Sequence, residues 1–177
     1  MPSHRVSNPI FRGPRGAILA IVILAVCAVV AGLLEPPPVA LSGRITASDG
    51  DSFRYGSERL RLLGMDAPEL AQTCVDGGGA QWACGHVARE QLGKLLHGKL
   101  SCQQQGNDRY GRILSRCLSG ETDIGAAMVA QGMAISSGDY GREEATARSA
   151  RRGIWAGSFE DPKTWRDQHP RSNLLDL

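Results

Sequence analysis

The chain has 177 residues, which is enough for one domain and a terminal appendage. It carries 20 lysines and arginines, three of which precede residue 35, so the remaining 17 face all 18 aspartates and glutamates. The composition therefore does not indicate a broad basic surface for binding nucleic acid. Any recognition of phosphate would have to depend on a few local residues.

An uncharged segment follows a basic N-terminal flank. Residues 1–16 form the flank, with His4, Arg5, Arg12 and Arg15, whereas residues 17–34 carry no charge. This length predicts a transmembrane signal anchor, and small residues near Ala31 leave a cleaved signal peptide as the alternative. By the positive-inside rule the rest would lie outside a bacterial inner membrane after a single pass, or be secreted after cleavage. The proline run in residues 35–42 predicts a stiff stalk.

Short segments with alternating apolar side chains follow the stalk. They predict strands over residues 43–47, 52–56 and 58–63, with a hairpin turn at Gly56. Pro68 favours an extended residue before it, so residues 65–69 should leave the third strand as a turn. Two further strands are predicted over residues 99–103 and 112–118.

Helical periodicity appears in three places of the same region. It predicts helices over residues 81–97, 123–133 and 142–152, separated from the strands by glycine-rich loops. Residues 158–177 form a polar tail that we expect to lie extended, with Trp165 as an anchor. Short strands with helices between them indicate an α+β protein that is mainly β.

Four cysteines lie outside the apolar segment, at positions 74, 84, 102 and 117. An even set predicts two disulfides in an oxidising compartment. Zinc is the alternative, but no pair has the close spacing of most structural zinc sites. If residues 99–103 and 112–118 pair as a hairpin, Cys102 and Cys117 can bridge across it. Cys74 and Cys84 would then join the preceding loop to the first helix.

Acids and arginines gather in two short stretches. The first runs from Asp49-Gly50-Asp51 to Asp66 and Glu69, and the second is Asp108-Arg109-Tyr110-Gly111-Arg112. Carboxylate oxygens are the ligands that Ca²⁺ and Mg²⁺ prefer. Arg61 and Arg112 offer the planar fork that matches phosphate geometry. Together these residues predict a metal-dependent phosphodiesterase.

The same stretches resemble the signature segments of the thermonuclease family, whose members are like staphylococcal nuclease. The family pattern is D-G-D-[TS], then R-[LV]-x-G-[IM]-D-x-P-E, then D-x-Y-G-R. This chain has Asp49 to Ser52, Arg61 to Glu69 and Asp108 to Arg112 in that order. The resemblance covers about residues 43–157 and implies a five-stranded OB-fold barrel with about three helices.

The resemblance also implies a role for each site residue. Asp51, Asp66 and the backbone carbonyl of Ala67 would hold Ca²⁺, although the family often has threonine at the position of Ala67. Glu69 would be the general base, and Arg61 and Arg112 would bind and stabilise the phosphate. The implied activity is that of a phosphodiesterase or endonuclease acting on DNA or RNA, with 3′-phosphate products.

Other residues near these motifs have smaller expected roles. We expect Asp49 to shape its turn and Asp108 to order its loop by accepting backbone N–H bonds. The resemblance suggests Arg109 and Tyr110 as a nucleotide-binding surface, and Tyr140 could stack on a base. We expect a monomer. Two alternatives stay open: a non-catalytic OB-fold module that binds nucleic acid or another polyanion, and a role in envelope or exopolysaccharide biology.

Overall fold

The computed structural model of the chain describes residues 14–34 and 37–170. It divides into two compact units, Met1–Pro37 and Pro38–Leu177. The first unit contains helix α1, Pro14–Leu34. The segment predicted as a membrane anchor is therefore helical, but no helix among the described residues combines the length and apolarity needed to cross a membrane. The expected anchor is not supported, and most of the expected basic flank lies outside the described residues.

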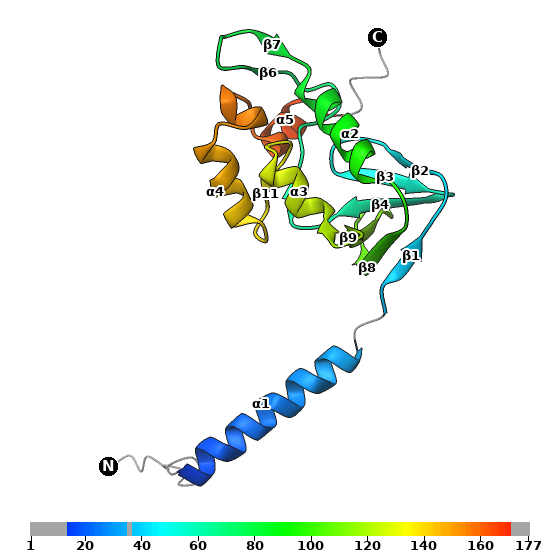
Figure 1. The fold of residues 1–177 in the computed structure, drawn as a ribbon, viewed down its shortest axis with the longest axis vertical. Helices are drawn as coiled ribbons and strands as arrows, with labels where there is room; N and C mark the ends of the chain where they lie inside the picture. Colours follow the sequence, from blue (N-terminus) through cyan, green and yellow to red (C-terminus); the bar gives the residue numbers. More distant parts are fainter. Residues whose placement is uncertain (1–13, 35–36, 171–177) are drawn as a thin grey trace, which may run out of the picture. The chain divides into compact units, whose positions relative to one another are not determined.

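The second unit is built on one curled, mainly antiparallel sheet (Figure 1). Its strands run in the order β1-β8-β9-β4-β3-β2, and β10 also pairs with β9. The exception to the antiparallel pattern is the parallel pairing of β4 with β9. Their bounds are β1 Val39–Leu41, β2 Ile45–Ala47, β3 Ser52–Tyr55, β4 Glu58–Leu62, β8 Leu100–Asn107, β9 Ile113–Ser119 and β10 Thr122–Asp123.

Helices and two small strand pairs complete this unit. Strands β5 and β11 form one pair, and β6 and β7 form a hairpin. The strand bounds are β5 Met65–Asp66, β6 Cys74–Val75, β7 Gln81–Trp82 and β11 Ile135–Ser136. The helices are α2 Cys84–Leu95, α3 Ile124–Ala130, α4 Gly141–Ser149, the 3₁₀ helix η2 Gly153–Ala156 and α5 Pro162–Gln168.

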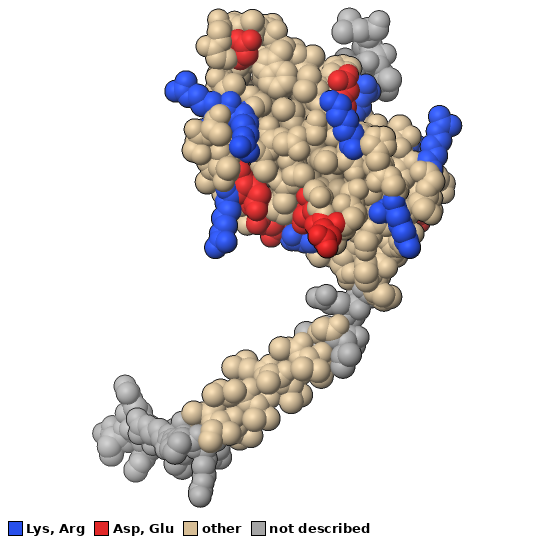
Figure 2. All heavy atoms as spheres, viewed as in Figure 1, with Lys and Arg blue, Asp and Glu red and all other residues tan. Residues whose placement is uncertain are grey.

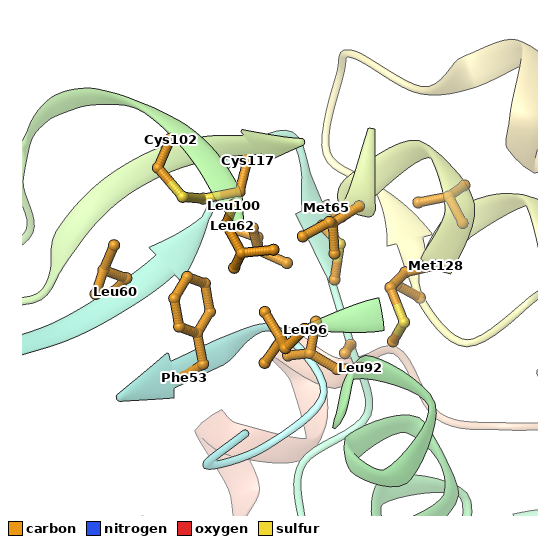
Figure 3. Packing of buried hydrophobic residues seen from close by; sticks show 14 of the residues in the cluster. Phe53, Leu60, Leu62, Met65, Leu92, Leu96, Leu100, Cys102, Cys117 and Met128 are labelled. Atoms are coloured by element: carbon orange, nitrogen blue, oxygen red, sulfur yellow. A yellow bond between two sulfur atoms is a disulfide. The ribbon is translucent and has the colours of Figure 1, made fainter. Parts of the chain in front are cut away.

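The main hydrophobic core lies between the sheet and the helices (Figure 3). Phe53 and Leu60 face each other across β3 and β4, and both are fully buried. Leu92 of α2 and Met128 of α3 are buried in the same cluster. A second, smaller cluster forms around Cys74, Cys84 and Ile154. Burial of these apolar side chains supplies most of the favourable free energy of folding.

Both predicted disulfides are present. Cys102 and Cys117 are direct partners in the β8–β9 pairing, with Cα atoms 4.1 Å apart. Cys74 and Cys84 bridge β6 to the first residue of α2, with Cα atoms 5.6 Å apart. All four cysteines are therefore in disulfides, and none of them can bind zinc as a thiolate.

The structure extends the predicted fold at both ends. Part of the expected stalk is strand β1, which pairs with β8, so the sheet begins before residue 43. The expected extended tail contains α5, while residues 171–177 lie outside the described part. The loop expected before the first helix holds the β6–β7 hairpin, and that helix starts at Cys84 rather than at residue 81. The mixed, mainly β class is confirmed. Within residues 37–170, however, the sheet has seven strands with β1 and β2 at the ends of its strand order, rather than the five expected.

Candidate active site

The turn between β2 and β3 fixes the first carboxylate of the site. The Asp49 side chain accepts hydrogen bonds from the backbone N–H groups of Asp51 and Ser52, at 3.0 and 2.7 Å. Burial opposes ionisation of Asp49, but the hydrogen bonds from Asp51 and Ser52 prevail and lower its pKa. Asp49 therefore shapes the turn and leaves Asp51 to face the rest of the site.

Gly50 lets the two acidic segments approach each other closely. A Cβ atom at this position would lie 2.6 Å from the Cβ of Ala67 and 2.9 Å from the Cβ of Ala88. Ala67 follows Asp66 directly, and Ala88 is buried on α2. Glycine is needed here because any side chain would push the Asp51 turn away from Asp66 and from the helix.

Arg61 joins the two predicted metal ligands. Its Nη1 lies 2.6 Å from Asp51 Oδ2, and its Nη2 lies 2.8 Å from Asp66 Oδ1. The pairing of β3 with β4 places Arg61 opposite Ser52, next to Asp51. The pairing of β5 with β11 fixes the backbone of Asp66. Sheet register thus brings together residues that are separate in the sequence.

The cluster holds more negative than positive groups. Burial raises the pKa of Asp51 well above its usual range, although the charge of Arg61 lowers it, and the charges of Asp49 and Asp66 raise it further. Burial also opposes the charge of Arg61, but Asp51 and Asp66 raise its pKa overall. A cation bound beside Asp51 would relieve this excess of negative charge.

Arg166, which no sequence motif indicated, is part of this cluster. Its Nη1 lies 2.9 Å from Asp66 Oδ1 and 2.9 Å from Glu69 Oε1, and its Nη2 lies 2.7 Å from Asp66 Oδ2. The hydrogen bonds to Asp66 are the largest cause of the raised pKa of Arg166. A tail residue therefore contacts both a predicted metal ligand and the predicted general base.

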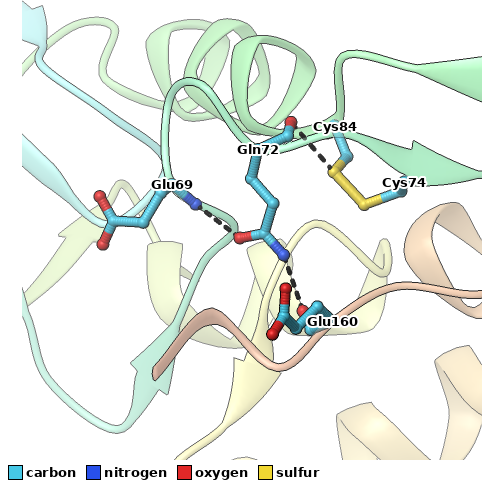
Figure 4. The surroundings of a disulfide bond; sticks show 5 residues. All are labelled: Glu69, Gln72, Cys74, Cys84 and Glu160. Atoms are coloured by element: carbon cyan, nitrogen blue, oxygen red, sulfur yellow. Dashed lines mark hydrogen bonds between the residues drawn. A yellow bond between two sulfur atoms is a disulfide. The ribbon is translucent and has the colours of Figure 1, made fainter. Parts of the chain in front are cut away.

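The backbone of Glu69 is held in place by the side chain of Gln72 (Figure 4). The Gln72 side chain is fully buried, and its Oε1 accepts the Glu69 backbone N–H at 3.1 Å. Its Nε2 donates to the Glu160 carbonyl at 2.7 Å. Its backbone carbonyl accepts the N–H of Gly85, the residue after Cys84. Gln72 thus connects the Glu69 loop, the start of α2 and the C-terminal segment.

Arg112 lies in a separate loop, directly before β9. Its Nε donates to Asp108 Oδ2 at 2.7 Å, and Asp108 Oδ1 accepts the backbone N–H groups of Tyr110 and Arg112. Burial opposes the ionisation of Asp108, but the hydrogen bonds from Arg112 and Tyr110 lower its pKa. Parallel pairing of β4 with β9 sets this loop next to β4, where Arg59 donates to the Tyr110 carbonyl.

The predicted nucleotide-contacting residues fall into two environments. Tyr110 is 57% exposed, and the guanidinium of Arg109 lies 4.8 Å from the centre of its ring, so both are accessible. Tyr140 is 6% exposed, and its hydroxyl donates to the Asp123 carboxylate at 3.1 Å. The predicted stacking of a base on Tyr140 does not fit this placement, because the ring packs in the core and supports α3.

Basic side chains do not gather into one large patch on the face shown in Figure 2. They stand apart from one another, with acidic side chains between some of them. This distribution agrees with the nearly equal numbers of basic and acidic residues. It indicates that any phosphate would be bound by a few individual side chains rather than by a broad basic surface.

The donor set fits a hard cation bound through a small number of protein ligands. Within residues 14–34 and 37–170, no three or more His, Cys, Asp or Glu side chains form a ready metal cage. Asp51 and Asp66, however, approach the same guanidinium, are both buried, and offer only oxygen donors. Ca²⁺ and Mg²⁺ take such ligands and complete their shells with water and backbone carbonyls.

A curled β-sheet with covering helices, combined with paired carboxylates and arginines, defines a protein of the staphylococcal nuclease type. The family model described as staphylococcal nuclease homologue matches residues 59–157. The chain belongs to this family, and the expected family resemblance is confirmed.

The relatives of this chain include one bacterial protein and two rice proteins. The chain is 32% identical over 153 residues to the succinoglycan biosynthesis protein ExoI of Rhizobium meliloti (strain 1021), covering 82% of this chain and 76% of that protein. It is 29% and 28% identical over 131 residues to the probable staphylococcal-like nucleases CAN2 and CAN3 of Oryza sativa subsp. japonica. Those alignments cover 70% of this chain but only 33% and 32% of the rice proteins. Family membership and the names of the rice proteins support a nuclease-type function.

Arg166 and Gln72 are the site residues that sequence reasoning missed. The pair Asp161-Pro162 is a helix start signal, since Asp161 caps α5 by accepting the N–H groups of Lys163 and Thr164. That signal could have located α5. Gln72 carried no sequence signal, because its importance comes from burial.

Proposed function

We propose that this protein is a calcium-dependent phosphodiesterase that hydrolyses DNA or RNA and leaves 3′-phosphate ends. The observation that carries the proposal is the joint contact of Arg61 with Asp51 and Asp66, next to a third carboxylate, Glu69. A module that only binds nucleic acid needs positive groups but has no use for three carboxylates held in one network by Arg61 and Arg166.

Each residue of the cluster has a chemical task in this proposal. Asp51, Asp66 and the Ala67 carbonyl would hold Ca²⁺, which when bound polarises a phosphoryl oxygen and favours ionisation of water. Glu69 accepts the proton of the attacking water. Arg61 and Arg112 donate to the phosphate oxygens as negative charge develops.

The observed arginine contacts are compatible with phosphate binding. Asp108 engages Arg112 through Nε, so the Nη groups can face a phosphate. Each Nη of Arg61 contacts one carboxylate and carries a second N–H. Both guanidinium groups are oriented by acids before substrate arrives, which reduces the entropy lost on binding.

Cleavage of plasmid DNA and of RNA by the purified chain, with Ca²⁺ and then with a chelator, tests the proposal. Glu69→Gln should lower turnover by about 10²- to 10⁴-fold while Ca²⁺ binding is retained, since it removes a base and little volume. Asp51→Asn should instead raise the Ca²⁺ concentration needed for activity. Glu90→Gln makes the same change as Glu69→Gln at an exposed position of α2 and should have no effect.

Several outcomes would contradict the proposal. Tight binding of nucleic acid without cleavage under any divalent cation would favour the non-catalytic module. An unchanged rate for Glu69→Gln, with loss of activity for Asp51→Asn, would keep the metal ligands and reject the general base.

A role in exopolysaccharide or envelope biology is the second candidate. It is favoured by the similarity to the Rhizobium protein, which is named for succinoglycan biosynthesis and aligns over 153 residues. The two disulfides support a location outside the reducing cytoplasm for either candidate. Absence of binding and cleavage of nucleic acid would favour this second candidate.

A further inference from the structure

One guanidinium contacts Asp66, which the proposed function assigns to the cation together with Asp51, and Glu69, which it assigns to the base. Arg166 contacts both oxygens of Asp66 and one oxygen of Glu69, at 2.7 to 2.9 Å. Its side chain is 34% exposed, whereas those of Asp66 and Glu69 are 12% and 19% exposed. Charged hydrogen bonds of this kind are among the stronger ones in proteins, particularly when one donor group spans two acceptors.

Arg166 lies in the segment of residues 158–168, whose N-terminal part is held by hydrogen bonds to the rest of the domain. The backbones of Val75 and Ser158 exchange two hydrogen bonds, at 2.8 and 3.0 Å. Gln72 then holds the Glu160 carbonyl, and Asp161 caps α5. Arg166 lies one turn further along this short helix. Loss of the Arg166 contacts would therefore leave the contacts of residues 158–160 intact.

Arg166 and a divalent cation bound to Asp66 would repel each other, because both are positively charged. Asp66 already contacts Arg61, so with Arg166 it carries two guanidinium groups. A cation bound to Asp51 and Asp66 would meet the positive charge of Arg166 across the same carboxylate. This repulsion is only partly screened by water, because the Asp66 side chain between the two positive charges is 12% exposed.

We propose that Arg166 is an internal competitor of the cation, and that Ca²⁺ binding displaces it from Asp66 and Glu69. This inference rests on the proposed function. The Nη1 of Arg166 contacts both the metal ligand Asp66 and the base Glu69. Displacement of Arg166 would therefore free Asp66 to bind the cation and Glu69 to accept a proton. Arg166 thereby sets the Ca²⁺ concentration at which Glu69 becomes free to accept a proton.

Titration calorimetry of the full chain with Ca²⁺ tests the competition directly. Arg166→Gln should bind Ca²⁺ about tenfold more tightly than the unaltered chain, a change worth about 1.4 kcal/mol. Arg166→Lys should fall between the two, since lysine keeps the charge but loses the fork. Lys163→Gln is the matched control, because Lys163 lies on α5 but pairs with the exposed Asp167. Its Ca²⁺ affinity should be unchanged.

Hydrogen exchange supplies a second readout that does not depend on any variant. Backbone amides of α5 should exchange faster in the unaltered chain when Ca²⁺ is added, while those of α2 should not. Equal or weaker Ca²⁺ binding by Arg166→Gln would overturn the inference, and so would unchanged exchange in α5. Lower turnover of Arg166→Gln at saturating Ca²⁺, with unaltered affinity, would make Arg166 a positioning residue and also overturn it.

The two proposals fail in different ways. A chain that binds Ca²⁺ more tightly as Arg166→Gln but cleaves no nucleic acid would support the competition and reject the proposed function. A chain that binds no Ca²⁺ in any of these forms would overturn the competition as well.

Discussion

Replacing Gln72 by leucine would test whether one buried amide holds the Glu69 loop and the C-terminal segment together. The substitution keeps the approximate volume of the side chain and removes both of its hydrogen bonds. It leaves the Glu69 N–H and the Glu160 carbonyl without the partners that they have at 3.1 and 2.7 Å. The backbone of residue 72 can keep its own hydrogen bonds to Glu69 and Gly85.

The size of the effect follows from the burial of these groups. Leaving a buried backbone group unsatisfied costs about 1–3 kcal/mol, and two groups are affected. Glu69 and Glu160 are both half-buried, so water can replace part of the loss at each group. The more apolar leucine recovers about 1 kcal/mol through burial. We expect Gln72→Leu to lower the free energy of unfolding by about 2 kcal/mol.

Chemical denaturation followed by circular dichroism measures this change, and Gln105→Leu is the matched control. Gln105 lies exposed on β8, so the same substitution there should change stability by less than about 0.5 kcal/mol. Hydrogen exchange should also show faster opening of residues 158–168 in Gln72→Leu. Equal stability of the two variants would refute the reasoning, since it would mean that water or local rearrangement satisfies both backbone groups.

Three further predictions concern the close packing at Gly50, the buried Tyr140 and the disulfide across β8 and β9. Gly50→Ala should lower the free energy of unfolding by about 1–3 kcal/mol and weaken Ca²⁺ binding, because the new methyl overlaps two alanine methyls; denaturation and calorimetry check this. Burial and the Asp123 carboxylate raise the pKa of Tyr140 from 10.0 to about 12. The stability linked to this group is therefore complete below pH 10 and is lost as pH rises toward 12, by up to about 2–3 kcal/mol, a loss that Tyr140→Phe should not show in denaturation series. Replacing both Cys102 and Cys117 by alanine removes a link across 15 residues and should lower the free energy of unfolding, measured by chemical denaturation, by about 3 kcal/mol.

Local patterns predicted the parts of the fold whose contacts are close in sequence. The β3–β4 hairpin follows from alternating apolar residues around Gly56, which has φ of 58°. The β8–β9 hairpin follows from similar signals and places Cys102 opposite Cys117. The capping of α3 by Asp123 was also predictable, because an aspartate before an apolar periodic segment favours a helix start.

The remaining features depend on contacts that no local pattern encodes. Arg166 and Asp66 are 100 residues apart in the sequence, and a seven-residue helix does not specify the surface against which it packs. Tyr140 follows a glycine and an aspartate, as an exposed loop residue would, yet Asp123 accepts its hydroxyl hydrogen bond and allows its burial. The register of β3 with β4, which brings Asp51 to Arg61, was likewise undetermined until the strands were paired.

The position of α5 has a practical consequence for dividing this protein into fragments. The family model covers residues 59–157, and a fragment cut to those limits would lack Asp51, together with strands β1 to β3. It would also lack Glu160, leaving the Gln72 amide without its acceptor, and Arg166. Such a fragment would be both less stable and chemically different from the chain.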